Sequence, residues 1–252
     1  MANHARELVE SALRNRKLDR TLTTALPPLE RMDAAALAAT GVTPLDATLR
    51  GGLPRGQLSE VVGSRSSGRT TLMLRCLAAA TARGEIAALI DTCDRLDVAT
   101  ALAAGVDFDR LLWVRGQASE RTAQSALTTV ERAVDHALKA LNLVLQAGGF
   151  GVVAIDLVDV APAVLRRLPF TTWMRVQRAI EGRDTACVLL ASEPLARSAG
   201  GLTLSLAGRA SWAGAACRSW RLERLDISTR VISPRRKVNG EVTIGALAID
   251  ER

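Results

Sequence analysis

The hydrophobic and polar positions of this chain predict strands and helices that alternate along the sequence. Several short runs are almost wholly apolar, which is typical of strands buried on both faces of a parallel sheet. These runs are residues 58–62, 86–91, 111–114, 151–160 and 186–192. Between them, apolar residues recur every three or four positions, as on one helix face; these stretches are residues 70–84, 97–104, 119–147 and 171–181. The alternation predicts an α/β fold with a mostly parallel, twisted sheet flanked by helices.

The N-terminal region departs from this alternation. Residues 4–18 place Leu8, Ala12 and Leu13 on one face of an amphipathic helix. We therefore interpret residues 1–36 as an N-terminal helical arm. Such an arm either packs on the core or docks a partner or a neighbouring subunit, and the sequence does not separate these roles.

The C-terminal region also changes character, from alternating elements to consecutive strands. Residues 220–232 and 241–249 have the composition of strands, and Asn239-Gly240 between them is a typical hairpin turn. We therefore expect antiparallel strands at the C-terminal end of a core domain that spans residues 37–252. Residues 208–252 of that domain form a basic hairpin in this interpretation.

The charge of the chain is concentrated in this hairpin. The formal net charge is +7, and residues 208–240 hold eight cationic side chains against Glu223 and Asp226. Such a segment favours an acidic partner, and DNA above all. The candidate DNA-binding residues are Arg218, Arg221, Arg230, Arg235, Arg236 and Lys237. The alternative is an edge strand that its arginines keep in water.

Aromatic residues make up only 3% of the chain, and tyrosine is absent. An extended platform of aromatic side chains for single-stranded nucleic acid is therefore not expected. Trp212 and Trp220 lie in the basic segment, where they could stack on bases or pack inside the fold.

Neither a metal site nor a membrane span is expected from the sequence. The cysteines have no metal-ligand or redox spacing, and Cys76 and Cys187 lie in apolar runs that suit reduced core residues. The chain has two histidines, which are far apart. The N-terminus has no signal-peptide pattern, and no apolar run reaches the length of a bilayer. We expect a cytoplasmic protein, associated with the nucleoid if it binds DNA.

The stretch "VVGSRSSGRTTLML", residues 61–74, closely matches a phosphate-binding loop. Gly63 and Gly68 have the required spacing, but Arg69 stands where the loop lysine belongs. Arginine is longer, planar and forked, so it can keep affinity for an anion while spoiling alignment for transfer. The candidate nucleotide-binding residues are Gly63, Ser67, Gly68, Arg69, Thr70, Thr71 and Asp156.

Asp156 ends one of the buried strands, which brings it to the same edge of the sheet as the loop. We hypothesise that it pairs with Arg69, so that a guanidinium fills the place of magnesium. The alternatives are that Asp156 caps a helix and that residues 63–71 only connect a strand to a helix.

At several points the chain resembles the RecA recombinase family. The resemblance runs from about Thr40 to Val231. It is carried by "GGLPRGQLSEVVGSRSSGRTTL", "ALIDTCDRLDVATALAAGVDFDRLLW", "VVAIDLVDV" and "ACVLLASEPLAR". It implies a RecA-like P-loop fold. It also places Cys93 at the family's catalytic glutamate and Ser192 at its glutamine sensor. Losing one positioned acid–base group costs about 10²- to 10⁴-fold in rate, so we expect no ATP turnover and no required cofactor, although ATP or ADP could still bind.

A RecA-like chain with a degenerate loop and a basic tail is similar to the ImuA group of accessory proteins. That resemblance implies a role in the SOS response to DNA damage, supporting error-prone translesion DNA synthesis. It also implies three partners: a Y-family polymerase homologue, an error-prone replicative-type polymerase, and RecA. The alternatives are an active DNA-dependent ATPase, such as a RecA paralogue or recombinase mediator, and an SOS inhibitor of cell division.

Overall fold

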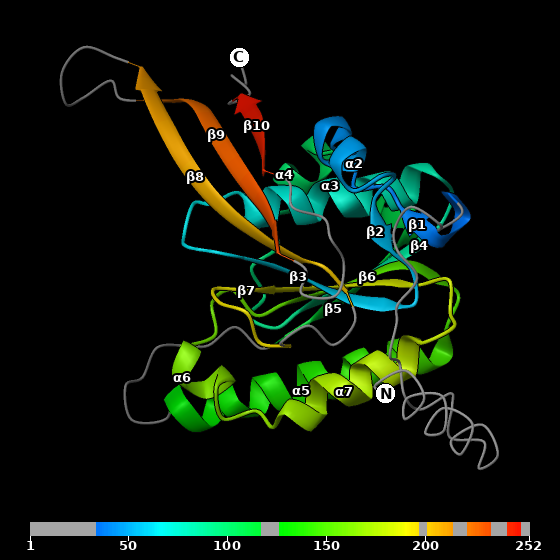
Figure 1. The fold of residues 1–252 in the computed structure, drawn as a ribbon. Helices are drawn as coiled ribbons and strands as arrows, with labels where there is room; N and C mark the ends of the chain where they lie inside the picture. The colour runs from blue at the N-terminus through cyan, green and yellow to red at the C-terminus, as the bar shows by residue number, and fades with distance from the viewer. Residues whose placement is uncertain (1–33, 117–125, 197–200, 214–220, 233–240, 248–252) are drawn as a thin grey trace, which may run out of the picture.

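The computed structural model describes residues 34–116, 126–196, 201–213, 221–232 and 241–247. The expected N-terminal helix, the start of the helix predicted at 119 and the Asn239-Gly240 turn lie outside these residues. The described part confirms the predicted fold class: an α/β domain around one large sheet, with helices on both faces (Figure 1).

The large sheet has eight strands in the order β10-β9-β8-β3-β7-β6-β4-β5. Strands β3 to β8 pair in parallel, and β8, β9 and β10 form an antiparallel ribbon at one side. The strands are β3 (Gln57–Gly63), β4 (Ile86–Asp91), β5 (Leu111–Arg115), β6 (Phe150–Asp156), β7 (Ala186–Ala191), β8 (Thr203–Ala213), β9 (Arg221–Ile232) and β10 (Glu241–Leu247). A small second sheet pairs β1 (Leu37–Ala38) with β2 (Leu53–Pro54).

Helices cover the two faces of the large sheet in separate groups (Figure 1). On one face lie α2 (Thr43–Thr48), α3 (Arg69–Ala82) and α4 (Val98–Ala103); on the other lie α5 (Ala126–Ala147), α6 (Pro162–Leu165) and α7 (Phe170–Ile180). Each group closes its own hydrophobic cluster against the strands. Cys76 on α3 and Cys187 on β7 are free and buried in these clusters, as the sequence predicted.

Strand β8 was not predicted. Leu204, Leu206, Ala210 and Trp212 alternate with other residues, but Gly208 interrupts this apolar row and most of the remaining side chains are small or polar. The strand is held by its neighbours instead, because it pairs in parallel with β3 and antiparallel with β9. The predicted strand 151–160 is also shorter than expected, because β6 ends at Asp156.

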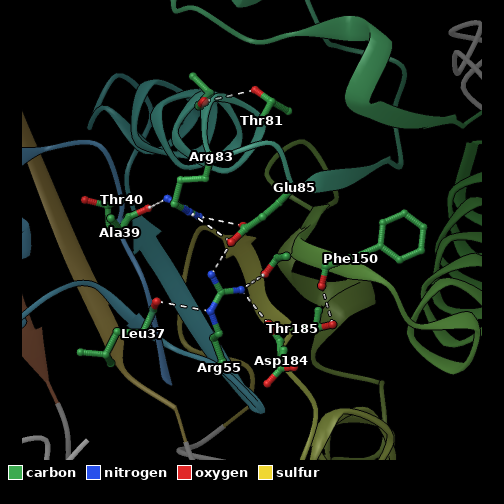
Figure 2. A network of polar contacts seen from close by, with 12 residues as sticks. Leu37, Ala39, Thr40, Arg55, Thr81, Arg83, Glu85, Phe150, Asp184 and Thr185 are labelled. Atoms are coloured by element: carbon green, nitrogen blue, oxygen red, sulfur yellow. Dashed lines mark hydrogen bonds and ion pairs between the residues drawn. The ribbon is translucent and has the colours of Figure 1, made fainter. Parts of the chain in front are cut away.

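Arg55 holds the amino ends of four parallel strands together, at the edge of the sheet opposite to the phosphate-type loop (Figure 2). Its guanidinium donates to the carbonyls of Gly151 at 3.2 Å and Asp184 at 2.7 Å, and to the carboxylate of Glu85 at 2.6 Å. It also donates to the carbonyl of Leu37, which is in β1. The strands whose carboxyl ends lie at the phosphate-type loop are therefore held together at their amino ends by Arg55.

Candidate functional site

The phosphate-type loop joins β3 to α3 through a tightly packed glycine path. Gly68 has φ = 89° and is the N-cap of α3, a conformation that L side chains rarely adopt. A Cβ on Gly68 would lie 2.2 Å from Cδ1 of Ile227 on β9, and one on Gly63 would lie 2.4 Å from the Leu206 carbonyl oxygen. On β8, a Cβ on Gly208 would lie 2.2 Å from the Ser66 carbonyl oxygen. The loop and the β8–β9 ribbon therefore approach each other too closely for side chains at these points.

An open cleft of about 690 Å³ lies in front of this loop. Ser67, Gly68, Arg69, Thr70 and Thr71, all among the predicted nucleotide-binding residues, line it. Gly63 lies against the Leu206 carbonyl and the Ser67 side chain, and Asp156 is within electrostatic range of Arg69. The structure thus brings five of the seven candidate nucleotide-binding residues to one cleft, and the other two, Gly63 and Asp156, do not line it.

Arg69 does not point into open solvent as a phosphate-binding cation would. Only 5% of the residue is exposed, and its Nη1 donates a 2.8 Å hydrogen bond to the carbonyl of Ala191, the last residue of β7. Burial lowers the pKa of this guanidinium, and the carboxylates of Asp156 and Asp159 act in the opposite direction. The side chain is therefore anchored to the sheet beneath the loop.

The predicted ion pair between Arg69 and Asp156 is wrong. Among the described residues, no ion pair links these two side chains; the guanidinium bonds to Ala191, and the Asp156 carboxylate accepts a 2.9 Å bond from the Val158 amide. The long arginine side chain reaches the end of β7, while Asp156 turns back to its own chain. Asp156 acts on Arg69 through space only.

The pKa of the Asp156 carboxyl group is also perturbed. Burial, with the nearby carboxylates of Asp91 and Asp159, raises the pKa of Asp156 to about 6, although the Val158 amide and Arg69 oppose the shift. Asp91 is its direct neighbour on β4. Two carboxylates therefore share this end of the sheet without a cation bonded between them, at a place where magnesium would be needed for phosphoryl transfer.

The segment after β4 is fixed in place by contacts that the sequence reasoning missed. The Asp91 carboxylate accepts hydrogen bonds from the amides of Arg95 at 2.8 Å and Leu96 at 2.9 Å, and from the Trp113 indole at 3.2 Å. Asp94 forms two 2.9 Å contacts with Arg115, whose guanidinium lies 4.7 Å from the Trp113 ring centroid. The two aspartates of "DTCD", residues 91–94, indicated that this segment makes polar contacts. Their partners on β5, Trp113 and Arg115, are distant in sequence and could not be predicted.

Cys93 lies inside this clamped segment, where the resemblance places a catalytic glutamate. Burial raises the pKa of its thiol to about 11, with Asp159 and Asp156 adding to the shift. The residue is therefore a neutral thiol near pH 7. A protonated thiol cannot accept a proton from an attacking water, so this position offers no general base.

Several buried hydroxyl groups at this edge of the sheet have no hydrogen-bond partner within the described part of the chain. They are Ser67 Oγ in the loop, Thr92 Oγ1 after β4 and Ser192 Oγ after β7. Buried polar groups are normally paired, and of these three residues Ser67 lines the cleft, where a polar ligand or water could complete the bonding of its hydroxyl. Ser192 is the residue that the resemblance aligned with the glutamine sensor.

The candidate DNA-binding residues are only partly within the described chain. Arg230 is exposed on β9, opposite Ser205 of β8 and Glu241 of β10, and Arg221 begins the same strand. The remaining four, Arg218, Arg235, Arg236 and Lys237, lie outside the described residues. Trp220 also lies outside, whereas Trp212 is 56% exposed and lines the cleft, so it is not a core residue.

Neither a membrane span nor a metal centre is present in the part of the chain that the structure covers. None of its helices combines the length and the apolar character that crossing a bilayer requires. Its histidine, cysteine and acidic residues include no group of three placed to hold a metal ion.

The order of the strands, the loop between β3 and α3, and the antiparallel ribbon beside them define a RecA-like α/β domain. Residues 24–162 match the RecA N-terminal domain, which is more than half of the 252 residues. The chain belongs to the RecA N-terminal domain family.

Similar proteins include several RecA proteins. The chain is 42% identical to RecA of Synechocystis over 95 residues, which cover 38% of this chain and 26% of that protein. It is 34% identical to RecA of Desulfotalea psychrophila over 128 residues, covering 50% and 32%. It is 32% identical to RecA of Desulforapulum autotrophicum over 153 residues, covering 55% and 40%. The chain thus spans between about a quarter and two fifths of these relatives.

Proposed function

We propose that this chain is a RecA-like protein of the bacterial DNA-damage response that binds DNA and protein partners without turning over ATP. It supports error-prone translesion synthesis, as the similarity to the ImuA group suggests. Its partners on this proposal are a Y-family polymerase homologue, an error-prone replicative-type polymerase and RecA. The likeness to RecA proteins supports the connection with DNA repair and recombination. The basic hairpin of residues 208–252 supports contact with DNA.

The observation that carries the absence of turnover is the position of Arg69. In a working loop, the lysine ammonium is a mobile point charge that spans the outer phosphates. Here the corresponding cation is buried and bonded to the Ala191 carbonyl. To serve a triphosphate it would have to leave that bond and reorient, which is the opposite of a preorganised site.

The rest of the site supports the same conclusion. Cys93 is a neutral thiol where a general base is needed, and the Asp156 carboxylate has a pKa near 6 and is turned toward the Val158 amide. The loop backbone still fits an anion, but these residues do not fit a catalytic magnesium ion with an activated water. On this proposal ATP or ADP is a ligand that the protein tolerates and does not require.

The first test is ATP turnover by the purified protein, with and without single-stranded DNA. We expect hydrolysis at the background level in both cases, and the same value for Thr70→Ala, because no preorganised site exists to be damaged. Phosphate release is the measurement. Hydrolysis that DNA stimulates and that Thr70→Ala abolishes would contradict the proposal and identify an active ATPase.

The second test is the salt dependence of DNA affinity. If the basic ribbon follows the phosphate backbone, log K should fall with log salt by about 0.7 per neutralised phosphate on a single strand and about 0.9 on a duplex. Changing Arg235, Arg236 and Lys237 together to alanine should flatten this slope by about 2 units. Fluorescence anisotropy of a labelled oligonucleotide at several salt concentrations measures it.

The matched control removes the same charge from helices α5 and α7. Lys139 on α5 and Arg175 and Arg178 on α7 are exposed, and their triple alanine variant should leave the slope unchanged. Equal slopes for all three proteins would show that the ribbon does not track phosphates.

A further inference from the structure

Helix α7 presents two large apolar side chains that the core of the domain does not use. Phe170 is 47% exposed and Met174 is 36% exposed, and neither is part of the hydrophobic clusters that the described residues form. The core contacts of the helix come instead from Trp173, Val176 and Ile180, which are buried. Large apolar side chains that lie together in water are typical of an interaction surface.

The start of α7 does not require Phe170 either. Pro169 is the N-cap of the helix, and Leu168 before it packs against the cluster that contains Trp173. A hydrophobic pair at these two positions fixes the angle at which a chain enters a helix. Phe170 therefore has no role in the core or in the start of the helix that would account for a phenyl ring at this place.

Phe170 and Met174 form one stripe, because residues four positions apart lie on the same side of a helix. Gln177, three residues further on, continues that side and bonds to the main chain at the start of β3. Its side-chain oxygen accepts a 3.0 Å bond from the Leu58 amide, and its nitrogen donates a 3.1 Å bond to the Gly56 carbonyl. The stripe therefore follows the flank of α7 that is turned toward β3, on the face of the sheet that α5 and α7 cover (Figure 1).

The surroundings of the stripe are strongly basic. Residues 162–180 contain four arginines and neither aspartate nor glutamate. Two of these arginines, Arg166 and Arg167, are held by glutamates of neighbouring segments. The other two, Arg175 and Arg178, are exposed, and no ion pair holds them within the part of the chain that the structure describes. Such cations beside an apolar stripe favour a partner that is apolar on one side and acidic around it.

This chemistry decides against two other occupants. The N-terminal arm of this chain, or of a second copy, is basic, because residues 4–18 contain four lysines and arginines against two glutamates. DNA would use the arginines alone, because phosphate oxygens bond to cations and gain nothing from a phenyl ring and a thioether at the surface of α7. An acidic amphipathic segment of another protein uses both the stripe and the charges.

We propose that the stripe of Phe170 and Met174 binds an acidic amphipathic helix of a partner protein. The apolar side of that helix covers the stripe, and its carboxylates reach Arg175 and Arg178 at the rim. The flexible methionine side chain lets the surface adapt to the shape of the partner. The proposal rests on the proposed function in one respect, that this chain binds protein partners, and it requires neither DNA nor a nucleotide.

The test begins with a phage-displayed library of amphipathic helices of about 20 residues, or about 30 Å, whose polar positions vary among Glu, Gln and Lys. The full chain is the target, and clones that also bind the double variant Phe170→Ser/Met174→Ser are removed. We expect the remaining clones to carry glutamates beside one apolar side. Neutral or basic clones, or a failure of any clone to distinguish the two proteins, would overturn the proposal.

The strongest acidic clone is then made as a labelled peptide, and fluorescence anisotropy measures its affinity. Phe170→Ser/Met174→Ser should bind it about 30-fold more weakly, because both side chains are already partly buried and gain only part of the full burial energy. Arg175→Gln/Arg178→Gln should bind it about 2- to 30-fold more weakly, with the larger loss at low salt. Equal affinity of the arginine variant and the wild type would contradict the proposal.

The matched control removes an apolar pair of the same spacing from the other face of the sheet. Val98 and Leu102 on α4 are 41% and 57% exposed, and α4 contains no arginine. Val98→Ser/Leu102→Ser should bind the acidic peptide as the wild type does. An equal loss in this variant would indicate general hydrophobic binding and overturn the proposal. Thermal unfolding checks that every variant is folded.

A DNA titration separates this proposal from the proposed function. The affinity for a labelled single strand should be the same in the wild type and in Phe170→Ser/Met174→Ser. If this variant lost affinity for DNA as well as for the peptide, the stripe would belong to a DNA-binding surface and the proposal would be wrong. If the wild type bound the peptide but not DNA, the DNA part of the proposed function would fail and the helix-binding site would stand.

Discussion

Replacing Arg55 by methionine is expected to lower the free energy of unfolding by about 3 kcal/mol. The change leaves the carbonyl of the buried Gly151 and that of the exposed Asp184 without this donor, and removes the shorter of the two ion pairs to Glu85. An unsatisfied buried polar group costs about 1–3 kcal/mol, and breaking a buried ion pair about 3–5. We take a value near the lower end because Glu85 keeps a second partner.

That second partner provides the control. Arg83 also bonds to Glu85, at 2.9 Å, but 32% of its side chain is exposed against 11% for Arg55. Arg83→Met should therefore cost about 1 kcal/mol or less, since exposed ion pairs contribute little. Urea unfolding followed by circular dichroism measures both losses. If the two variants lost the same stability, the amino ends of the strands would not depend on Arg55.

Replacing Gly68 by alanine should cost about 3–5 kcal/mol. Two effects act together. A residue with a side chain is strained at φ = 89°, at about 1–3 kcal/mol, and the new Cβ would lie 2.2 Å from Cδ1 of the buried Ile227, which adds about 1–3 kcal/mol of overpacking. The start of α3 and the β9 strand would both have to move.

Gly84 separates the two effects. It has a similar backbone angle, φ = 82°, but nothing lies within 4 Å of the position of its Cβ. Gly84→Ala should therefore show the strain alone, about 1 kcal/mol. In the Gly68→Ala background, Ile227→Val removes the overlapping Cδ1 and should restore part of the lost stability. No recovery in that double variant would mean that the ribbon does not press on the loop.

The sequence predicted most of the sheet because its central strands are buried on both faces. Strands such as β4, β6 and β7 are almost wholly apolar and buried. Their hydrophobic pattern alone was therefore enough to predict them as central strands. Strand β8 lies between β3 and β9, and its Gly208 is set by contact with the loop and not by hydrophobic burial. The hydrophobic pattern could not predict a strand whose composition depends on its contact with the phosphate-type loop, which is distant in sequence.

The candidate site followed the same division. The spacing of Gly63 and Gly68 correctly placed the loop, because a strand, a glycine path and a helix are local features. The partner of Arg69 was predicted wrongly because Asp156 and the Ala191 carbonyl both lie at the same sheet edge. Which of the two bonds to Arg69 depends on the conformation of the arginine side chain, and packing sets that conformation. Trp212 could be assigned to a cleft only once strand β8 was known to lie beside the loop.

The close approach of Gly208 and Ile227 to the loop has a mechanical consequence. With no slack between them, the loop cannot shift toward β8 and β9 without displacing the ribbon, and a displaced ribbon must move the loop. A partner that binds the ribbon and a small molecule that binds at the start of α3 would therefore each change the affinity of the protein for the other. By thermodynamic reciprocity, the factor by which one alters the grip of the other is the same in both directions.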